Sequence, residues 1–183
     1  MDGETSLKNI LRAQDTLRGI SYITQIATHK DLDAAASATV FLKCENLQRT
    51  GSFKFRGAYY AATQVKTRGK TRTVATISSG NHGQGLALAA KLLGLSAHVI
   101  VPKPYLQRKF DAIVQHGAHA IAVDDRSTAN QVLQEILRSE KACLIHAFND
   151  PLVIAGQGTV MLELLLQVSD LEIVLAQIGR AHV

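Results

Sequence analysis

The sequence lacks the features that mark several classes of protein. Its 183 residues include no tryptophan and only 5% aromatic residues, too few for the platforms on which single-stranded nucleic acids stack. The net charge is +5, but lysine and arginine are scattered without a basic run, so we expect no nucleic-acid partner. No apolar stretch reaches membrane-spanning length and the polar start is no secretory signal, so we expect no membrane partner and a cytoplasmic location.

Cysteine is also scarce. Cys44 and Cys143 belong to no C-x-x-C or Cys/His ligand spacing. We interpret both as small core residues of a protein in a reducing compartment. The histidines are spread over different segments without ligand spacing, which predicts that there is no metal site.

What the sequence does contain is a regular alternation of short apolar runs and amphipathic stretches. We predict strands at 40–44, 73–77, 97–101, 119–123, 143–146 and 171–176. We predict helices at 52–64 with Ser52 as N-cap, and at 83–93, 106–116, 127–139 and 153–168. The strands are almost continuously apolar, which indicates an α/β fold with a parallel sheet and helices on both faces.

Lys54 is an unusual charged residue, because it lies between Phe53 and Phe55. An ammonium usually stays in water, since burying it without a partner costs several kcal/mol. Burial also lowers the pKa of lysine, which turns the side chain into a nucleophilic amine. The pattern therefore makes Lys54 a candidate catalytic residue.

The segment 78–85, SSGNHGQG, follows the predicted strand 73–77 and opens a helix. Ligands of parallel α/β sheets bind outside the carboxyl ends of strands, and helix N-termini attract carboxylates and phosphates. A tight turn with a capping serine explains this segment equally well, and it matches neither the P-loop nor the dinucleotide fingerprint. His82 is either a base or a cap of the helix.

The motifs together resemble one family. The segment 43–58, KCENLQRTGSFKFRGA, resembles the lysine region of threonine dehydratases and serine racemases, and 78–85 resembles their substrate loop. The segments 124–126 (DDR), 146–151 (HAFNDP) and 154–159 (IAGQGT) follow in the family's order. The resemblance implies a fold-type II enzyme dependent on pyridoxal phosphate (PLP), tryptophan synthase beta-like, with parallel sheets, helices on both faces and two domains.

By the same resemblance, residues 1–72 and 151–183 form an incomplete large PLP-binding domain, and residues 73–150 form a small αβ domain. Lys54 holds PLP covalently and moves the Cα proton on one face of the substrate. Ser79 occupies the position of the residue that, in the racemases, moves the proton on the other face. Phe53 packs against the pyridine ring, and Asn81 hydrogen-bonds its 3′-oxygen. The substrate carboxylate is bound by Ser78, Ser79, Gly80, Asn81 and His82.

The activity implied is deamination of L-threonine and/or L-serine to a 2-oxo acid and ammonia, by a protein that is a homo-oligomer when full length. Two alternatives stay open. A serine racemase with lyase side activity uses the same Lys54 and Ser79, whereas a non-catalytic α/β module for an anion or nucleotide needs Lys54 only as a charge.

The sequence departs from the family at its end. The family has a run of glycines that cradles the PLP phosphate, and this chain has Gly179 followed by Arg180-Ala181-His182-Val183. A bulky side chain blocks the close approach of a phosphate to backbone N–H groups. We therefore expect a fragment, in which 178–183 is an assembly scar, with poor stability and weak activity at best.

Overall fold

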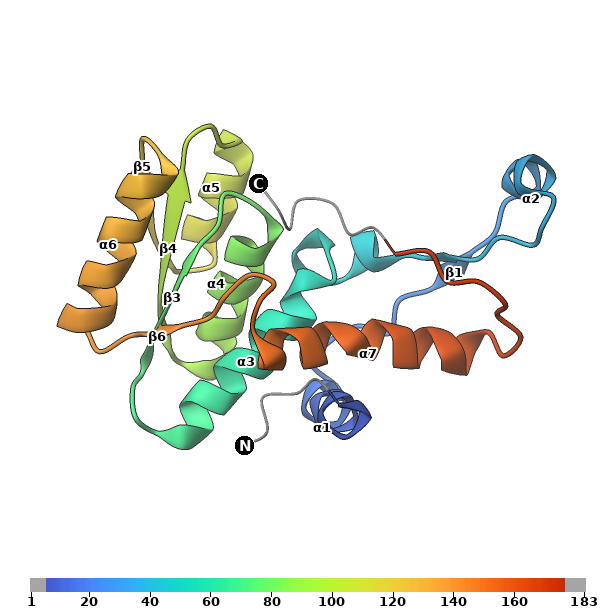
Figure 1. Ribbon diagram of the computed structural model, residues 1–183, viewed down its shortest axis with the longest axis horizontal. Coiled ribbons are helices and arrows are strands. Elements are labelled where there is room, and N and C mark those ends of the chain that lie inside the picture. The colour runs from blue at the N-terminus through green and yellow to red at the C-terminus, as the bar shows by residue number, and fades with distance from the viewer. Residues whose placement is uncertain (1–5, 177–183) are drawn as a thin grey trace.

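The structure, a computed structural model, describes residues 6–176. Its helices and strands are, in chain order, α1 (Leu7–Leu17), β1 (Ile26–Ala27), α2 (Lys30–Ala36), β2 (Leu42–Lys43), the 3₁₀ turns η1 (Glu45–Leu47) and η2 (Arg49–Gly51), α3 (Lys54–Arg68), β3 (Thr73–Ile77), α4 (Asn81–Leu93), β4 (Ser96–Pro102), α5 (Gln107–Gln115), β5 (His119–Val123), α6 (Arg126–Ser139), β6 (Cys143–Leu144) and α7 (Pro151–Gln167). In Figure 1, α6, the sheet and the pair α4–α5 form layers at one end, while α7 and α1 lie beside α3 and the β1–β2 pair lies beyond them.

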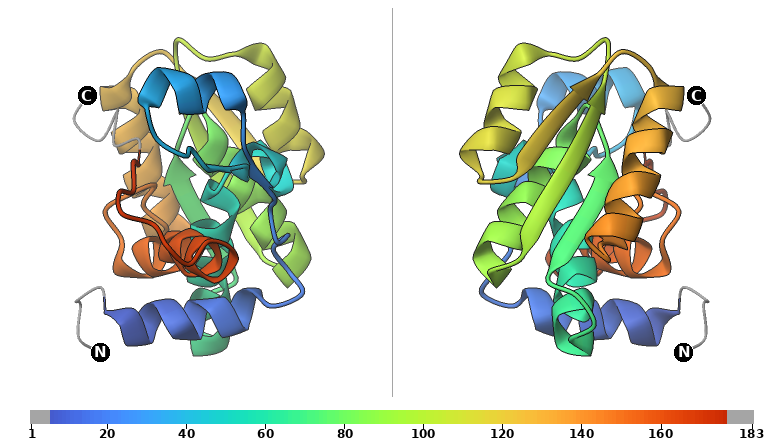
Figure 2. Two further views of the ribbon diagram at one scale, coloured as in Figure 1. Left: turned by 90° about the vertical axis from the view of Figure 1, so that its right-hand side faces the viewer. Right: turned by 90° about the vertical axis from the view of Figure 1, so that its left-hand side faces the viewer.

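The main sheet has four strands in the order β5–β4–β3–β6, and every neighbouring pair is parallel. Successive side chains of a strand point to opposite faces. Accordingly Val74 packs into the core on the side of α4 and α5, whereas its neighbour Ala75 packs with Leu133 and Ile136 of α6. Figure 2 shows these helices on either side of the strands. The predicted parallel sheet covered on both faces is confirmed.

Helix α3 lies in the centre of the fold, between α4 and α7. A Cβ atom placed on Gly57 would lie 2.6 Å from the carbonyl oxygen of Val153, and one on Gly156 would lie 2.7 Å from the carbonyl oxygen of Arg56. The backbones of α3 and α7 are therefore in contact where the two helices cross, which only glycine allows. One hydrophobic core joins α3, α4 and the sheet. The division into domains near residue 72 stays a prediction.

A buried ionic cluster holds the elements around α3 together. Arg56, which is 1% exposed, donates two hydrogen bonds to Glu45, at 2.7 and 2.9 Å. It donates a third to Glu163 of α7 at 3.0 Å, and Glu163 also accepts a bond from Lys43 at 2.5 Å. Such a cluster is tolerated in a core because every charge has a partner. Sequence reasoning missed it.

Three predictions for local structure are wrong. Residues 171–176 form no strand, because no described strand pairs with them, and Leu175 is 92% exposed. Ser52 is not the N-cap of α3, since Phe53 occupies that position. The predicted strand 40–44 shortens to β2, which pairs antiparallel with β1 outside the parallel sheet.

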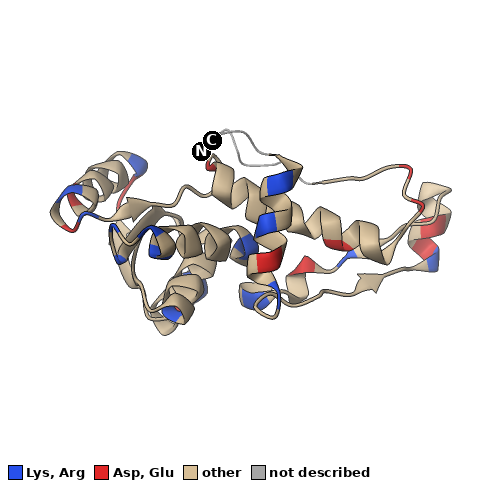
Figure 3. Cartoon of the chain, turned by 90° about the horizontal axis from the view of Figure 1, so that it is seen from below, with Lys and Arg blue, Asp and Glu red and all other residues tan. Residues whose placement is uncertain are grey.

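Two surface properties complete the description. Within residues 6–176 no helix is long and apolar enough to cross a bilayer. Figure 3 shows lysine and arginine distributed from one end of the molecule to the other, with acidic residues among them.

Candidate active site

The two motifs that the sequence singles out meet at the first turns of α3 and α4. A Cβ atom on Gly85 would lie 3.1 Å from the backbone nitrogen of Phe55 and 3.3 Å from the carbonyl carbon of Lys54. Any side chain at Gly85 would therefore push apart the two helices. Because Gly85 has no side chain, the segment that carries Lys54 can lie beside the loop Ser78–His82.

Lys54 is half-buried and forms no ion pair with the described carboxylates. Its Nζ atom donates a hydrogen bond to the carbonyl oxygen of Ala147 at 2.9 Å and lies 5.2 Å from the centroid of the Phe53 ring. Burial lowers the pKa of Lys54. The neutral amine, which is the nucleophilic form, is therefore more abundant near neutral pH than in an exposed lysine.

The loop before α4 presents donors to a ligand. The hydroxyl of Ser78 shapes the turn, because it accepts hydrogen bonds from the N–H groups of Gly80 at 3.2 Å and Gly83 at 3.0 Å. The hydroxyl of Ser79 and the backbone N–H groups of Ser79, Asn81 and His82 make no hydrogen bond within the described residues. Unpaired N–H groups at a helix N-terminus attract anions, so this end of α4 can bind a carboxylate.

The side chain of His82 is buried and contacts the segment after β6. Its Nε2 atom lies 3.2 Å from the carbonyl oxygen of Ile145, so Nε2 must carry a proton. Burial, assisted by the positive charges of Lys54 and His146 and opposed by the bond to Ile145, lowers the pKa of His82 to about 4. The imidazole is thus neutral at pH 7 and anchors α4 to the segment after β6. It does not cap the helix.

Lys54 and His82 thus contact carbonyl groups two residues apart in one segment, at Ala147 and Ile145. Sequence reasoning missed these carbonyls, and no side-chain pattern could have revealed them because the acceptors are backbone atoms. It also missed Lys109 of α5, whose Nζ atom donates to the Oδ1 atom of Asn81 at 3.0 Å.

A family profile described as pyridoxal-phosphate dependent enzyme matches residues 19–182. The chain belongs to this family. Serine racemase of Arabidopsis thaliana is 34% identical over 93% of this chain and 52% of its own length. L-threonine ammonia-lyase of Thermotoga maritima is 36% identical over 95% of this chain and 44% of its own length.

Solved structures agree with the sequence comparison. The crystal structure of serine racemase from Dictyostelium discoideum is similar with a TM-score of 0.86 and 35% identity, over 92% of this chain and 55% of that one. The fold is therefore that of the fold-type II PLP enzymes. The chain spans about half the length of the curated relatives it matches.

The described residues fit the reactive part of the family's cofactor. PLP carries an aldehyde that a neutral amine attacks, and Lys54 supplies such an amine. The hydroxyls of Thr50 and Ser52, in the turn just before Lys54, are buried and have no hydrogen-bond partner within the structure. Buried hydroxyls usually have partners, so a polar ligand is expected nearby. Residues 179–183, where the sequence departs from the family's phosphate-binding glycines, lie outside the described residues.

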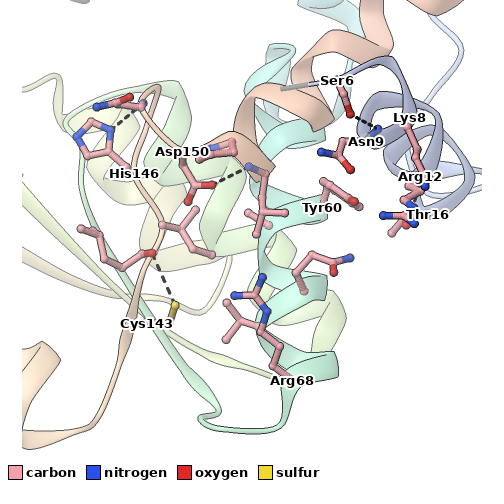
Figure 4. Close-up of a pocket in the computed structure, with 18 of the residues that line it drawn as sticks. Ser6, Lys8, Asn9, Arg12, Thr16, Tyr60, Arg68, Cys143, His146 and Asp150 are labelled. Carbon is pink, nitrogen blue, oxygen red and sulfur yellow. Dashed lines mark hydrogen bonds between the residues drawn. The ribbon is translucent and has the colours of Figure 1, made fainter. Parts of the chain in front are cut away.

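A separate cavity of about 1200 Å³ lies between α1, α3 and the segment that leads from β6 to α7. Figure 4 shows Ser6, the N-cap of α1, with Lys8 and Arg12 of that helix on one side, and Cys143 and His146 on the other. None of the predicted site residues lines this cavity. Within residues 6–176, no group of three or more His, Cys, Asp or Glu side chains could hold a metal ion.

Proposed function

We propose that this chain carries the lysine and the substrate loop of a PLP-dependent ammonia-lyase that converts L-threonine and/or L-serine into a 2-oxo acid and ammonia. The observation that carries the proposal is Lys54: a half-buried amine with a lowered pKa and no carboxylate partner among the described residues. It lies beside the N-terminus of α4, where the backbone N–H groups of Asn81 and His82 make no hydrogen bond within the described residues. PLP, when bound, withdraws electrons from the Cα atom of an amino acid.

The residues of this chain then have separate roles. Lys54 binds the cofactor and moves the proton at Cα. Phe53 packs against the pyridine ring and Asn81 donates to its 3′-oxygen. The first turn of α4, from Ser78 to His82, holds the substrate carboxylate with backbone N–H groups and the Ser79 hydroxyl. These groups orient the substrate and place the proton acceptor within reach, which is the protein's share of the chemistry.

The proposal extends to the context of the chain. Residues 1–72 with 151–183 are part of the large domain and 73–150 are the small domain, and the substrate is a small amino acid. The complete protein is a homo-oligomer of the cytoplasm. The names of the relatives, which are those of amino-acid racemases and ammonia-lyases, support the class of substrate, and the two free thiols support the location.

A serine racemase with lyase side activity is the second candidate. It is favoured by the Ser79 hydroxyl, which makes no hydrogen bond within the described residues, and by the match to serine racemases. A module that only binds an anion or nucleotide is a third candidate, and the unpaired N–H groups of α4 favour it.

The test uses a protein that joins this chain to the C-terminal half found in its relatives, loaded with PLP. We expect a near-visible absorption band that Lys54→Ala abolishes and that Lys66→Ala, a change at an exposed lysine of α3, leaves intact. Supplied L-threonine or L-serine should yield a 2-oxo acid and ammonia. D-serine as the main product would favour the racemase, and an absorption spectrum that Lys54→Ala leaves unchanged would favour the binding module.

A further inference from the structure

Helix α5 places a lysine directly over the start of α4. Ile113 of α5 is fully buried, and its Cδ1 atom lies 3.1 Å from the point that a Cβ atom on Gly83 would occupy. Residues four apart lie on one face of a helix. Lys109, one turn before Ile113, therefore faces α4 as well, and its Nζ atom donates to the Oδ1 atom of Asn81 at 3.0 Å. The packing of Ile113 against Gly83 therefore places the ammonium group of Lys109 at the start of α4.

The hydrogen bond from Lys109 orients the amide of Asn81. An ammonium group has three donors and no acceptor, so it can bind only the oxygen of an amide. The NH₂ group of Asn81 then points away from Lys109, and it makes no hydrogen bond within the described residues. Asn81 is left as a donor whose direction is set by Lys109.

The stability of α4 does not explain a lysine at this position. The N-terminus of a helix carries partial positive charge, and a cation beside it is unfavourable. Lys109 forms no ion pair with a carboxylate of residues 6–176. Asp111, two residues along α5, accepts a hydrogen bond from Gln107 instead. A cation held at a positively charged helix end by an amide oxygen is better explained by an anion that binds nearby.

We propose that Lys109 is a positioning residue for the cofactor: it holds the Asn81 amide so that the NH₂ group donates to the 3′-oxygen of the PLP ring. The inference rests on the proposed function, because it requires PLP to bind beside Lys54. Lys109 itself moves no proton and does not touch the reacting atoms. Its positive charge adds to the attraction that the N-terminus of α4 exerts on anions.

The test compares three variants of the PLP-loaded protein described above. Lys109→Met keeps the length of the side chain but removes the donor and the charge, and Lys109→Arg restores both. Arg108→Met removes the same charge from the preceding residue of α5, which is exposed and makes no hydrogen bond or ion pair with α4 within the described residues. Two quantities are measured: the dissociation constant of PLP, and the wavelength and pH midpoint of the near-visible band.

We expect Lys109→Met to weaken PLP binding about tenfold, or about 1.4 kcal/mol, and to shift the pH midpoint of the band upward. The midpoint rises because a lost donor leaves the deprotonated ring oxygen less stabilised. Lys109→Arg should restore both quantities to within about threefold of the wild type, and Arg108→Met should change neither.

The outcomes separate this inference from the proposed function. If the wild type binds PLP on Lys54 and Lys109→Met leaves the affinity and the band unchanged, the role of Lys109 is refuted while the proposed function stands. If Arg108→Met has the same effect as Lys109→Met, the effect is one of net charge and the positioning role is again refuted. If the wild type takes up no PLP, both proposals fail.

Discussion

Acid should destabilise the fold through His82. The imidazole is buried and its pKa falls from 6.5 to about 4 in the folded chain, first because of burial and then because Lys54 and His146 are positive. Below pH 6.5 the imidazole of His82 is protonated in the unfolded chain. In the folded chain it stays neutral until the pH falls to about 4. Stability due to this residue is therefore complete above pH 6.5 and is lost as the pH falls toward 4. Each pKa unit corresponds to about 1.4 kcal/mol, so the full loss is about 3 kcal/mol.

The assay is urea-induced unfolding followed by circular dichroism at pH 7 and pH 4.5. His82→Gln does not titrate, and its amide can still donate to the carbonyl of Ile145. We expect the free energy of unfolding of the wild type to fall by about 2–3 kcal/mol more than that of His82→Gln. His119→Gln, at an exposed position of β5, should behave like the wild type. Equal losses in the wild type and in His82→Gln would refute the reasoning.

Three further substitutions test other parts of the account. Gly156→Ala should lower the free energy of unfolding by about 1–3 kcal/mol, because its Cβ atom would meet the backbone of α3, whereas Gly158→Ala meets only a flexible side chain and should cost clearly less. Arg56→Leu leaves the buried Glu45 without its cation and Glu163 with Lys43 as its remaining cation, and should cost about 3–5 kcal/mol in the same assay, against about 1 kcal/mol or less for Arg18→Leu at an exposed pair. Ser79→Ala should reduce the formation of D-serine by the PLP-loaded protein more than the release of ammonia. An equal loss of both activities would contradict a role of Ser79 in proton transfer on one face of the substrate.

The sheet could be predicted from the sequence because its strands are short apolar runs bounded by clear turns. The limits of β3 and β5 agree with the predicted strands 73–77 and 119–123, and α4 ends at Leu93, the last residue of the predicted helix 83–93. The run 171–176 is just as apolar, yet it forms no strand. A strand exists only through hydrogen bonds to a neighbour, and the residues that would supply one are not encoded in the run itself.

The candidate site could be predicted only in part. Lys54 and the loop Ser78–His82 are visible because unusual residue types cluster in sequence. Their helices meet because Gly85 lacks a side chain, which is a tertiary contact. The contact of Lys109 with Asn81 depends on how α5 packs, and nothing near either residue in the sequence indicates it.

The central claim is that Lys54 is the amine that reacts with PLP. The chain is mixed with PLP near neutral pH, reduced with borohydride, digested and mapped by mass spectrometry. Because burial lowers the pKa of Lys54, we predict that the label accumulates on Lys54 well ahead of exposed lysines such as Lys66 and Lys70. A label spread evenly over the lysines, or absent from Lys54, would contradict the account.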